Sequence, residues 1–122
     1  MKQFNLTTGK IGEQIAAREL QKRGYQIIGQ NFRTRFGEID LIARDGDILI
    51  FVEVKARKGI GFGLPQEAVG FKKQNKIIRG ALQYIRDNRL GEISWRIDVV
   101  SIILDYKGNL KSFDLIKNAV MR

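Results

Sequence analysis

The sequence predicts a mixed α/β fold in which helices cover a β-sheet. Two segments carry apolar residues at helical spacing, and the other segments are rich in β-branched and aromatic residues, as strands are. The elements follow the order helix, three strands, helix, two strands. A strand, a helix and a further strand in succession indicate a crossover, which joins parallel strands. The predicted sheet therefore contains a parallel pair.

The first helix is expected over residues 8–23, with Thr8 as N-cap and Gly24 where a left-handed C-terminal residue belongs. The second helix is expected over residues 71–88, with its cations mostly turned away from an apolar stripe. This stripe consists of Ile77, Ile78, Ala81, Leu82 and Ile85. The two helices would cover the sheet.

Strands are expected at residues 25–32, in both arms of a hairpin over residues 37–55, at residues 95–104 and at residues 110–116. The fourth is apolar enough for a central strand, and the fifth is expected at an edge. Residues 59–65 form the glycine-rich segment, which predicts a loop and lacks the Lys-Ser/Thr of a P-loop. Without repeats or long linkers, residues 1–122 are expected to form one domain.

The hairpin holds the densest group of acids. Asp45-Gly46 predicts a two-residue turn at these two residues. Such a turn would pair Arg44 with Asp47, Ile42 with Leu49, Asp40 with Phe51 and Glu38 with Glu53. Because strand side chains alternate between faces, one face would then carry Glu38, Asp40, Glu53 and Lys55. Three carboxylates on one face repel each other and require a cationic partner.

Two other interpretations of the hairpin remain open. A three-residue turn, Asp45 to Asp47, would place Asp40 opposite Val52 and send the acids to different faces. Alternatively, the acids lie on the solvent side of an ordinary amphipathic hairpin. Phe51 argues against the second interpretation, because it puts apolar bulk on the acid-bearing face as well.

Composition restricts the chemistry. The chain has no His and no Cys, which excludes zinc sites of the usual ligand types, nucleophiles activated by His, and disulfides. Carboxylate ligands remain, and they suit a hard cation such as Mg²⁺ or Mn²⁺. No apolar run is long enough to span a bilayer and residues 1–10 lack a signal-peptide core, so a cytoplasmic protein without a membrane partner is expected.

The charge balance indicates a polyanionic partner. The formal net charge is +9, and residues 55–86 hold eight cations and one anion, Glu67. A basic stretch directly after an acidic cluster fits a nucleic acid whose phosphates are held by Lys and Arg. A solubilising surface would show the same charge pattern.

Glu13 lies on an apolar stripe of the first predicted helix, with Ala16, Ala17 and Leu20 at i+3, i+4 and i+7. A helix packed on the acid-bearing face would deliver this carboxylate to the other acids. A partly exposed glutamate, or a first-turn acid that complements the helix dipole, explains it equally well.

These residues resemble a family. Asp40, the motif Glu53-Val54-Lys55 and the preceding Glu13 are similar to the PD-(D/E)xK nuclease superfamily, and within it to the archaeal Holliday-junction resolvases. The chain resembles the bacterial YraN-like family more narrowly. The motifs are Gly12-Glu13, Asn31, Gly37-Glu38-Ile39-Asp40-Leu41-Ile42, Phe51-Val52-Glu53-Val54-Lys55, Pro65 with Glu67-Ala68-Val69, Lys73 with Arg79, and Arg96-Ile97-Asp98-Val99-Val100.

The resemblance implies a restriction-endonuclease-like sheet flanked by helices, in the order α-β-β-β-α-β-β. It also implies that Asp40, Glu53 and the carbonyl of Val54 bind the divalent metal, with Glu13 completing the site directly or through water. Lys55 would then help to orient the attacking water and stabilise the transition state.

Further candidates surround this set. Glu38 is a possible ligand at the edge of the site, and Asp98 is a possible site acid or an acceptor for Arg96 or a neighbouring loop. Gln74 could position water or backbone, or lie on the helix surface. The expected nucleic-acid-binding residues are Arg57, Lys58, Lys72, Lys73, Gln74, Lys76 and Arg79.

Two functions of different classes follow. The first is a metal-dependent DNA endonuclease, for which branched or structured substrates and a homodimer are compatible with the sequence. The second is a non-catalytic nucleic-acid-binding module of the same fold, such as a repair or recombination accessory protein. The combination of Asp40, Glu53 and Lys55 favours the first, because acids that face phosphates bring no benefit to a binder.

Overall fold

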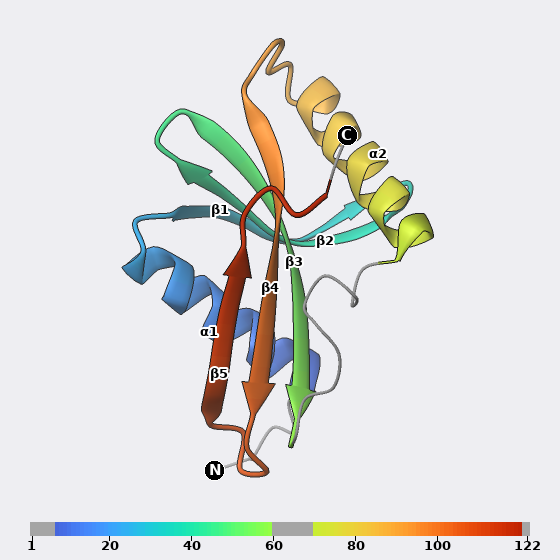
Figure 1. Cartoon of the computed structure of the whole chain (residues 1–122). Helices are drawn as coiled ribbons and strands as arrows, with labels where there is room; N and C mark the ends of the chain where they lie inside the picture. Colours follow the sequence, from blue (N-terminus) through green and yellow to red (C-terminus); the bar gives the residue numbers. More distant parts are fainter. Residues whose placement is uncertain (1–6, 60–69, 121–122) are drawn as a thin grey trace, which may run out of the picture.

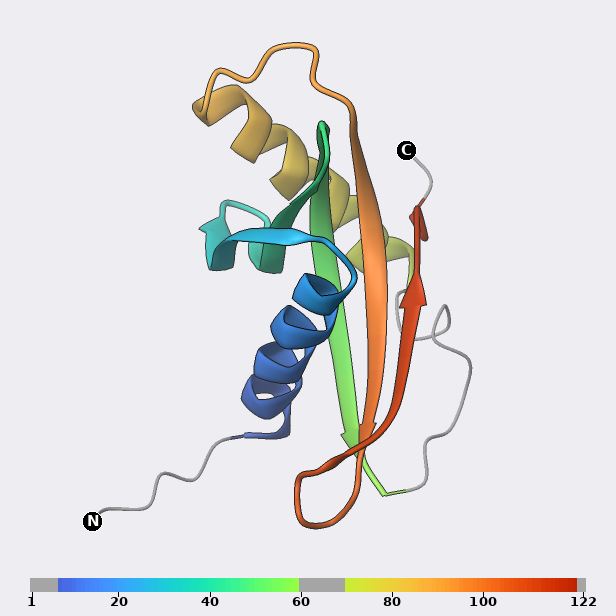
Figure 2. The same cartoon turned by 90° about the vertical axis from the view of Figure 1, so that its left-hand side faces the viewer.

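The computed structural model describes residues 7–59 and 70–120. A five-stranded sheet has the order β1-β2-β3-β4-β5, with one helix packed on each face (Figures 1 and 2). The elements are α1 (Thr8–Lys22), β1 (Gln26–Thr34), β2 (Gly37–Asp45), β3 (Ile48–Lys58), α2 (Phe71–Asp87), β4 (Trp95–Leu104) and β5 (Leu110–Ile116). The predicted order along the chain is confirmed.

The sheet is mixed. β3 and β4 are parallel, and the other neighbouring pairs are antiparallel. The chain between β3 and β4 includes α2, so this pair is the crossover that the sequence predicts. β4 lies inside the sheet and β5 at its edge, both with the predicted bounds.

The N-cap of the first helix lies one residue earlier than predicted. The Oγ1 atom of Thr7 accepts a hydrogen bond from the backbone N–H of Lys10 at 3.1 Å, so Thr7 is the N-cap and Thr8 is already helical. At the other end, Gly24 has a φ of 91°, which is the left-handed conformation expected there.

The helices bury apolar residues against opposite faces of the sheet. On the α1 face the core consists of Ile15, Ala16, Ala17 and Leu20 of the helix with Leu41, Ala43, Ile50 and Val52 of the sheet, among others. On the α2 face it includes Ile77, Ala81 and Ile85 with Ile42, Phe51, Ile97 and Val99. The predicted α2 stripe is too wide, because Leu82 is 50% exposed.

Gly12 sets how close α1 lies to β3. A Cβ atom on this residue would clash with the Cβ of Ala56 on the strand. Because glycine has no side chain, the helix backbone can approach the sheet at this point. Glu13, the next residue, is thereby carried to the sheet as well.

The predicted hairpin register is wrong. The turn lies one residue further along the chain than predicted, so each residue of β2 pairs with a residue of β3 two positions later than predicted. The two turn residues are Gly46 and Asp47, and Gly46 has a φ of 60° at the first central position, as in a type II′ turn. The observed pairs are Asp45 with Ile48, Arg44 with Leu49, Ala43 with Ile50, Ile42 with Phe51 and Leu41 with Val52. The three-residue turn is wrong too, since Val52 lies opposite Leu41.

Some predictions fall outside the described residues. These are the loop at residues 60–65 and the motif residues Pro65 and Glu67-Ala68-Val69. Within residues 7–59 and 70–120, neither helix has the length and apolar character needed to cross a membrane.

Candidate metal centre

The candidate site lies where β2 separates from β3. Their pairing ends at Leu41 and Val52, and Asp40 and Glu53 are the next residues on the two strands. From there β3 continues beside β4, while β2 runs away from it (Figure 1). The separation would leave the N–H of Val54 without a partner strand, but the Oδ2 atom of Asp40 accepts from it at 2.8 Å. The carboxylate of Asp40 therefore occupies the gap between the strands.

The acids come together as predicted, but not through the regular strand alternation on which the prediction of a single acidic face relied. Ile39 packs in the core under α2, whereas Leu41 packs in the core under α1, so the regular alternation along β2 is broken at Asp40. Glu53 lies on the α2 face of β3, because its neighbour Val54 packs toward α1. Asp40 is thus at the junction of the two faces and can be reached from both.

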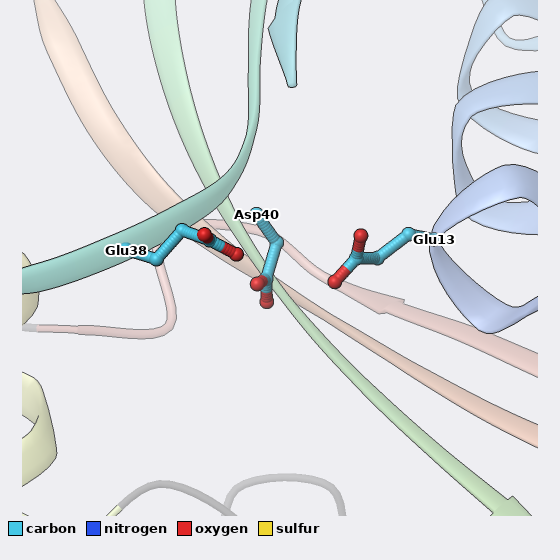
Figure 3. A group of neighbouring side chains, drawn as sticks. All are labelled: Glu13, Glu38 and Asp40. Atoms are coloured by element: carbon cyan, nitrogen blue, oxygen red, sulfur yellow. The ribbon is translucent and has the colours of Figure 1, made fainter. Parts of the chain in front are cut away.

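Glu13 reaches Asp40 from the α1 side (Figure 3). Carboxylate oxygens of Glu13, Glu38 and Asp40 lie within 4.8 Å of one another. The Nδ2 atom of Asn31 donates to Glu13 at 2.7 Å and to Glu38 at 3.1 Å, which fixes both side chains. The expectation that α1 packs on the face of Glu53 is incorrect; the helix packs on the opposite face and contributes its acid through the gap.

Two lysines accompany Glu53, which is only 3% exposed. The Nζ atom of Lys73 lies 2.9 Å from Glu53 Oε2, and that of Lys55 lies 3.9 Å from the same oxygen. The hydrogen bond to Glu53 raises the pKa of Lys73, against the opposing effect of burial. A buried carboxylate is stable only with such partners.

Asp40 is in a strongly anionic environment. Burial is the main cause that raises its pKa to about 8, followed by the charge of Glu53 and a hydrogen bond between the two carboxyl groups. Glu13 raises it further, and the N–H of Val54 opposes the change. A divalent cation would offset both the burial and the repulsion, and the oxygen-only donors are those that Mg²⁺ or Mn²⁺ prefers. The side chains present therefore fit such a metal.

Asp98 belongs to a separate buried network. Its carboxylate accepts from the hydroxyl of Tyr25 at 2.9 Å, from Nε of Arg96 at 2.9 Å and from the backbone N–H of Asn118 at 2.8 Å. The structure therefore gives Asp98 the alternative role predicted for it, as an acceptor for Arg96 and a nearby loop.

The other predicted nucleic-acid-binding residues lie on β3 and α2. Exposed side chains are those of Arg57, Lys58, Lys72, Lys76 and Arg79. Gln74 is half-buried near the start of α2. Lys73, the member of the predicted set between Lys72 and Gln74, forms an ion pair with Glu53.

The contacts of Lys73 and Asn31 with the acids are not predicted from the sequence. Lys73 is four residues before Ile77, so it lies on the helix face that packs on the sheet, and this spacing could have revealed it. Asn31 has a φ of 50° between strand residues. Asparagine tolerates this conformation better than most residues, but a lone Asn gives no signal of its partners.

Comparison with known proteins places the chain in a family. Residues 12–102 match the model of the Uncharacterised protein family UPF0102. The chain belongs to this family. A UPF0102 protein of Syntrophus aciditrophicus (strain SB) is 51% identical over 115 residues, which cover 94% of this chain and 89% of the relative. A UPF0102 protein of Dictyoglomus turgidum is 44% identical over 115 residues, covering 94% and 98%. The family recognised from the motifs is confirmed.

A solved structure is also similar to this UPF0102 chain. It is a chain of an EndoMS-dsDNA2 complex, with a TM-score of 0.42 and 15% sequence identity. The similarity covers 84% of the present chain and 38% of the other, so the present chain spans well under half of that protein's length.

Proposed function

We propose that this UPF0102 protein is a metal-dependent endonuclease that hydrolyses phosphodiester bonds in DNA. The observation that carries the proposal is the position of Asp40, which is held by Val54 in the gap between β2 and β3 and meets acids from both faces of the sheet. The element order and the mixed sheet are those that the PD-(D/E)xK resemblance implies. The same resemblance supports branched DNA as one of the proposed substrates.

Asp40 and Glu53 would hold Mg²⁺ or Mn²⁺, with Glu13 as a third ligand directly or through water. The N–H of Val54 points into the gap, and the N–H and C=O of one strand residue point to the same side, which supports its carbonyl as a ligand. Glu38 remains a candidate at the edge of the site. The bound ion supplies positive charge to a phosphate oxygen and lowers the pKa of a water molecule.

The two lysines would divide the remaining work. Lys73 donates to Glu53 at 2.9 Å and holds this carboxylate in place. Lys55 is 3.9 Å from Glu53, beyond hydrogen-bond distance, and its side chain is 31% exposed, so its ammonium can turn to a phosphate. There it stabilises the negative charge that develops on the phosphate oxygens. The surrounding cations of β3 and α2 would hold the neighbouring phosphates.

The test combines Mn²⁺ calorimetry with cleavage of linear, flapped and four-way DNA. Lys55→Ala is expected to cut about 100-fold more slowly or worse while it binds Mn²⁺ like the wild type, because its ammonium acts where charge develops. Asp40→Asn is expected to lose Mn²⁺ binding and cleavage together. Lys111→Ala, which removes an exposed cation of β5, is the matched control and should cut normally.

A non-catalytic nucleic-acid-binding module is the second candidate. The exposed cations of α2 favour it, because a binder would use them without any need for the acids. If the wild type binds all three DNA substrates and cuts none, this second function replaces the first. Cutting that persists in both variants would come from a contaminant and would contradict the proposed site.

A further inference from the structure

The outer face of α2 is basic from Lys72 to Arg86, and Arg86 forms an ion pair with the exposed Asp87 at the end of the helix, 3.3 Å from Nε to Oδ1. Its exposed cations Lys72, Lys76, Arg79 and Arg86 follow one another at helical intervals and share a side, with Gln83 between the last two. At 1.5 Å per residue this row extends about 21 Å. The opposite side of the helix is the one that packs on the sheet through Ile77, Ala81 and Ile85.

A pocket opens on this basic face where the turn between β1 and β2 meets α2. The turn and the helix lie side by side in both views (Figures 1 and 2). The backbone N–H of Arg35 donates to Oε1 of Gln83 at 2.9 Å and fastens the turn to the helix. The pocket is lined by Phe36, Arg79, Leu82, Gln83 and Arg86.

The lining combines apolar and cationic groups. Leu82 is 50% exposed although it is a large apolar residue, and Phe36 is half-buried beside it. The guanidinium carbon of Arg79 lies 5.8 Å from the centroid of the Phe36 ring. The lining residues include no acid, and although Arg86 is paired with the neighbouring Asp87, Arg79 supplies positive charge beside the apolar groups, so the pocket offers dispersion contacts next to a cation.

A nucleotide base with a free face matches this chemistry. Bases stack on aromatic side chains and on arginine, and their phosphates need nearby cations. In a fully paired duplex the faces of the bases are covered by their neighbours, so a duplex could use only the cations. Charge complementarity therefore favours a nucleic acid, and the apolar lining favours a strand with unpaired bases.

We propose that the pocket binds an unpaired base of a single-stranded segment of nucleic acid, whose phosphates follow the basic face of α2. The inference rests on the proposed nucleic-acid function and specifies its substrate. The preferred substrate is a strand that is single-stranded or frayed next to the cleavage site.

The test is fluorescence anisotropy in EDTA, where no cleavage occurs, with a labelled oligothymidine and a blunt duplex of equal length. Phe36→Ala is expected to weaken oligothymidine binding about five-fold or more, the equivalent of about 1 kcal/mol, and to leave duplex binding unchanged. Leu82→Ala, at a half-exposed position that tolerates truncation, is expected to act in the same direction. Leu110→Ala removes a leucine that is 40% exposed on β5, and is the control.

Equal affinities of the wild type, Phe36→Ala and Leu82→Ala for oligothymidine would overturn the proposal that the pocket binds a base. An equal loss for oligothymidine and duplex in both variants would overturn it as well, because stacking acts only on the unpaired strand. In either case the nuclease proposal stands. If the wild type binds neither probe, it is the proposed nucleic-acid function that fails.

Discussion

The carboxyl group of Asp40 has two tasks at once. It accepts a hydrogen bond from the backbone N–H of Val54, at a point where β2 no longer pairs with β3, and it lies close to other carboxylates. The hydrogen bond stabilises the sheet, and the repulsion between the carboxylates destabilises it. The balance between them depends on pH and can be measured.

Asp40→Asn tests this balance. The carboxyl group ionises at about 8 in the folded protein and near 3.8 in the unfolded chain. Between these pH values the folded state binds one proton more than the unfolded chain. The contribution of Asp40 to the free energy of unfolding is therefore full below pH 3.8 and is lost as the pH rises toward 8. The asparagine keeps an oxygen for Val54 and has no charge. We expect its Tm in EDTA to exceed that of the wild type by several degrees at pH 8, with little difference near pH 4.

Thermal unfolding across this pH range provides the measurement. Asp114→Asn, at an exposed position of β5, is the control and should not show the pH-dependent gain. A lower Tm of Asp40→Asn at pH 8 would mean that the charge on Asp40 is compensated in the fold, contrary to its raised pKa.

Tyr25 makes a second residue-scale prediction. Its hydroxyl donates to Asp98 and accepts from Nη2 of Arg96 at 2.9 Å, and the side chain is 4% exposed. Tyr25→Phe removes one partner from the buried Asp98 and one from the half-buried Arg96, so we expect a loss of about 1–3 kcal/mol in the free energy of unfolding, measured with urea. Tyr106→Phe, at a residue that is 84% exposed, should change it little. Equal effects of the two substitutions would contradict the role of the network.

At the scale of elements, the contact of α1 with β3 controls the site. Gly12→Ala would place a methyl group against Ala56 and force the helix away, at a cost of about 1–3 kcal/mol. Because Glu13 moves with the helix, Mn²⁺ affinity is expected to fall as well. Calorimetry and urea unfolding measure the two effects.

A compensating change makes this prediction specific. Ala56→Gly frees the space and should restore Mn²⁺ affinity in the double variant. Gly9→Ala, at an exposed position one turn earlier, is the control for helix propensity. Metal affinity that stays low in the double variant would show that the distance between helix and strand is not the cause.

Sequence patterns predicted the elements better than their mutual placement. β4 and β5 have the predicted bounds because turn residues flank two clearly apolar or amphipathic runs. The hairpin register was wrong because Asp-Gly fits a turn that starts at either residue, and the predicted type I′ turn needs a positive φ at Asp45 that this residue does not adopt. The predicted pairing of Asp40 with Phe51 is wrong, but Asp40 and Glu53 still lie close together, because the register shift kept the same parity.

The assembly of the site was only partly predictable. The sequence indicated which acids and which lysine matter, but not that β2 leaves β3 at Asp40, because strand divergence depends on the packing of both helices. For the same reason Glu13 was expected from the wrong face. Lys73 could have been found from its distance to Ile77, and Asn31 could not.

At the scale of the whole molecule, the net charge of +9 predicts that DNA binding depends on salt. Variants of equal net charge can separate the effect of where the charges lie from the effect of their total. Lys72→Glu with Lys76→Glu is expected to weaken DNA binding more than ten-fold and to reduce the slope of affinity against salt. Lys111→Glu with Lys117→Glu gives the same net charge at exposed positions outside α2. Equal losses in the two double variants, measured by anisotropy at several salt concentrations, would show that total charge alone governs binding.

The bond from Val54 to Asp40 also bears on how such a chain would change after losing activity. An inactive descendant could replace Lys55 by drift, since its side chain is partly exposed and its removal leaves no backbone group unpaired. Replacement of Asp40 by a residue without a side-chain oxygen would orphan the N–H of Val54, at about 1–3 kcal/mol. Selection for folding alone would therefore retain Asp or Asn at position 40. Among relatives, the residue at position 55 is the better record of whether catalysis was kept.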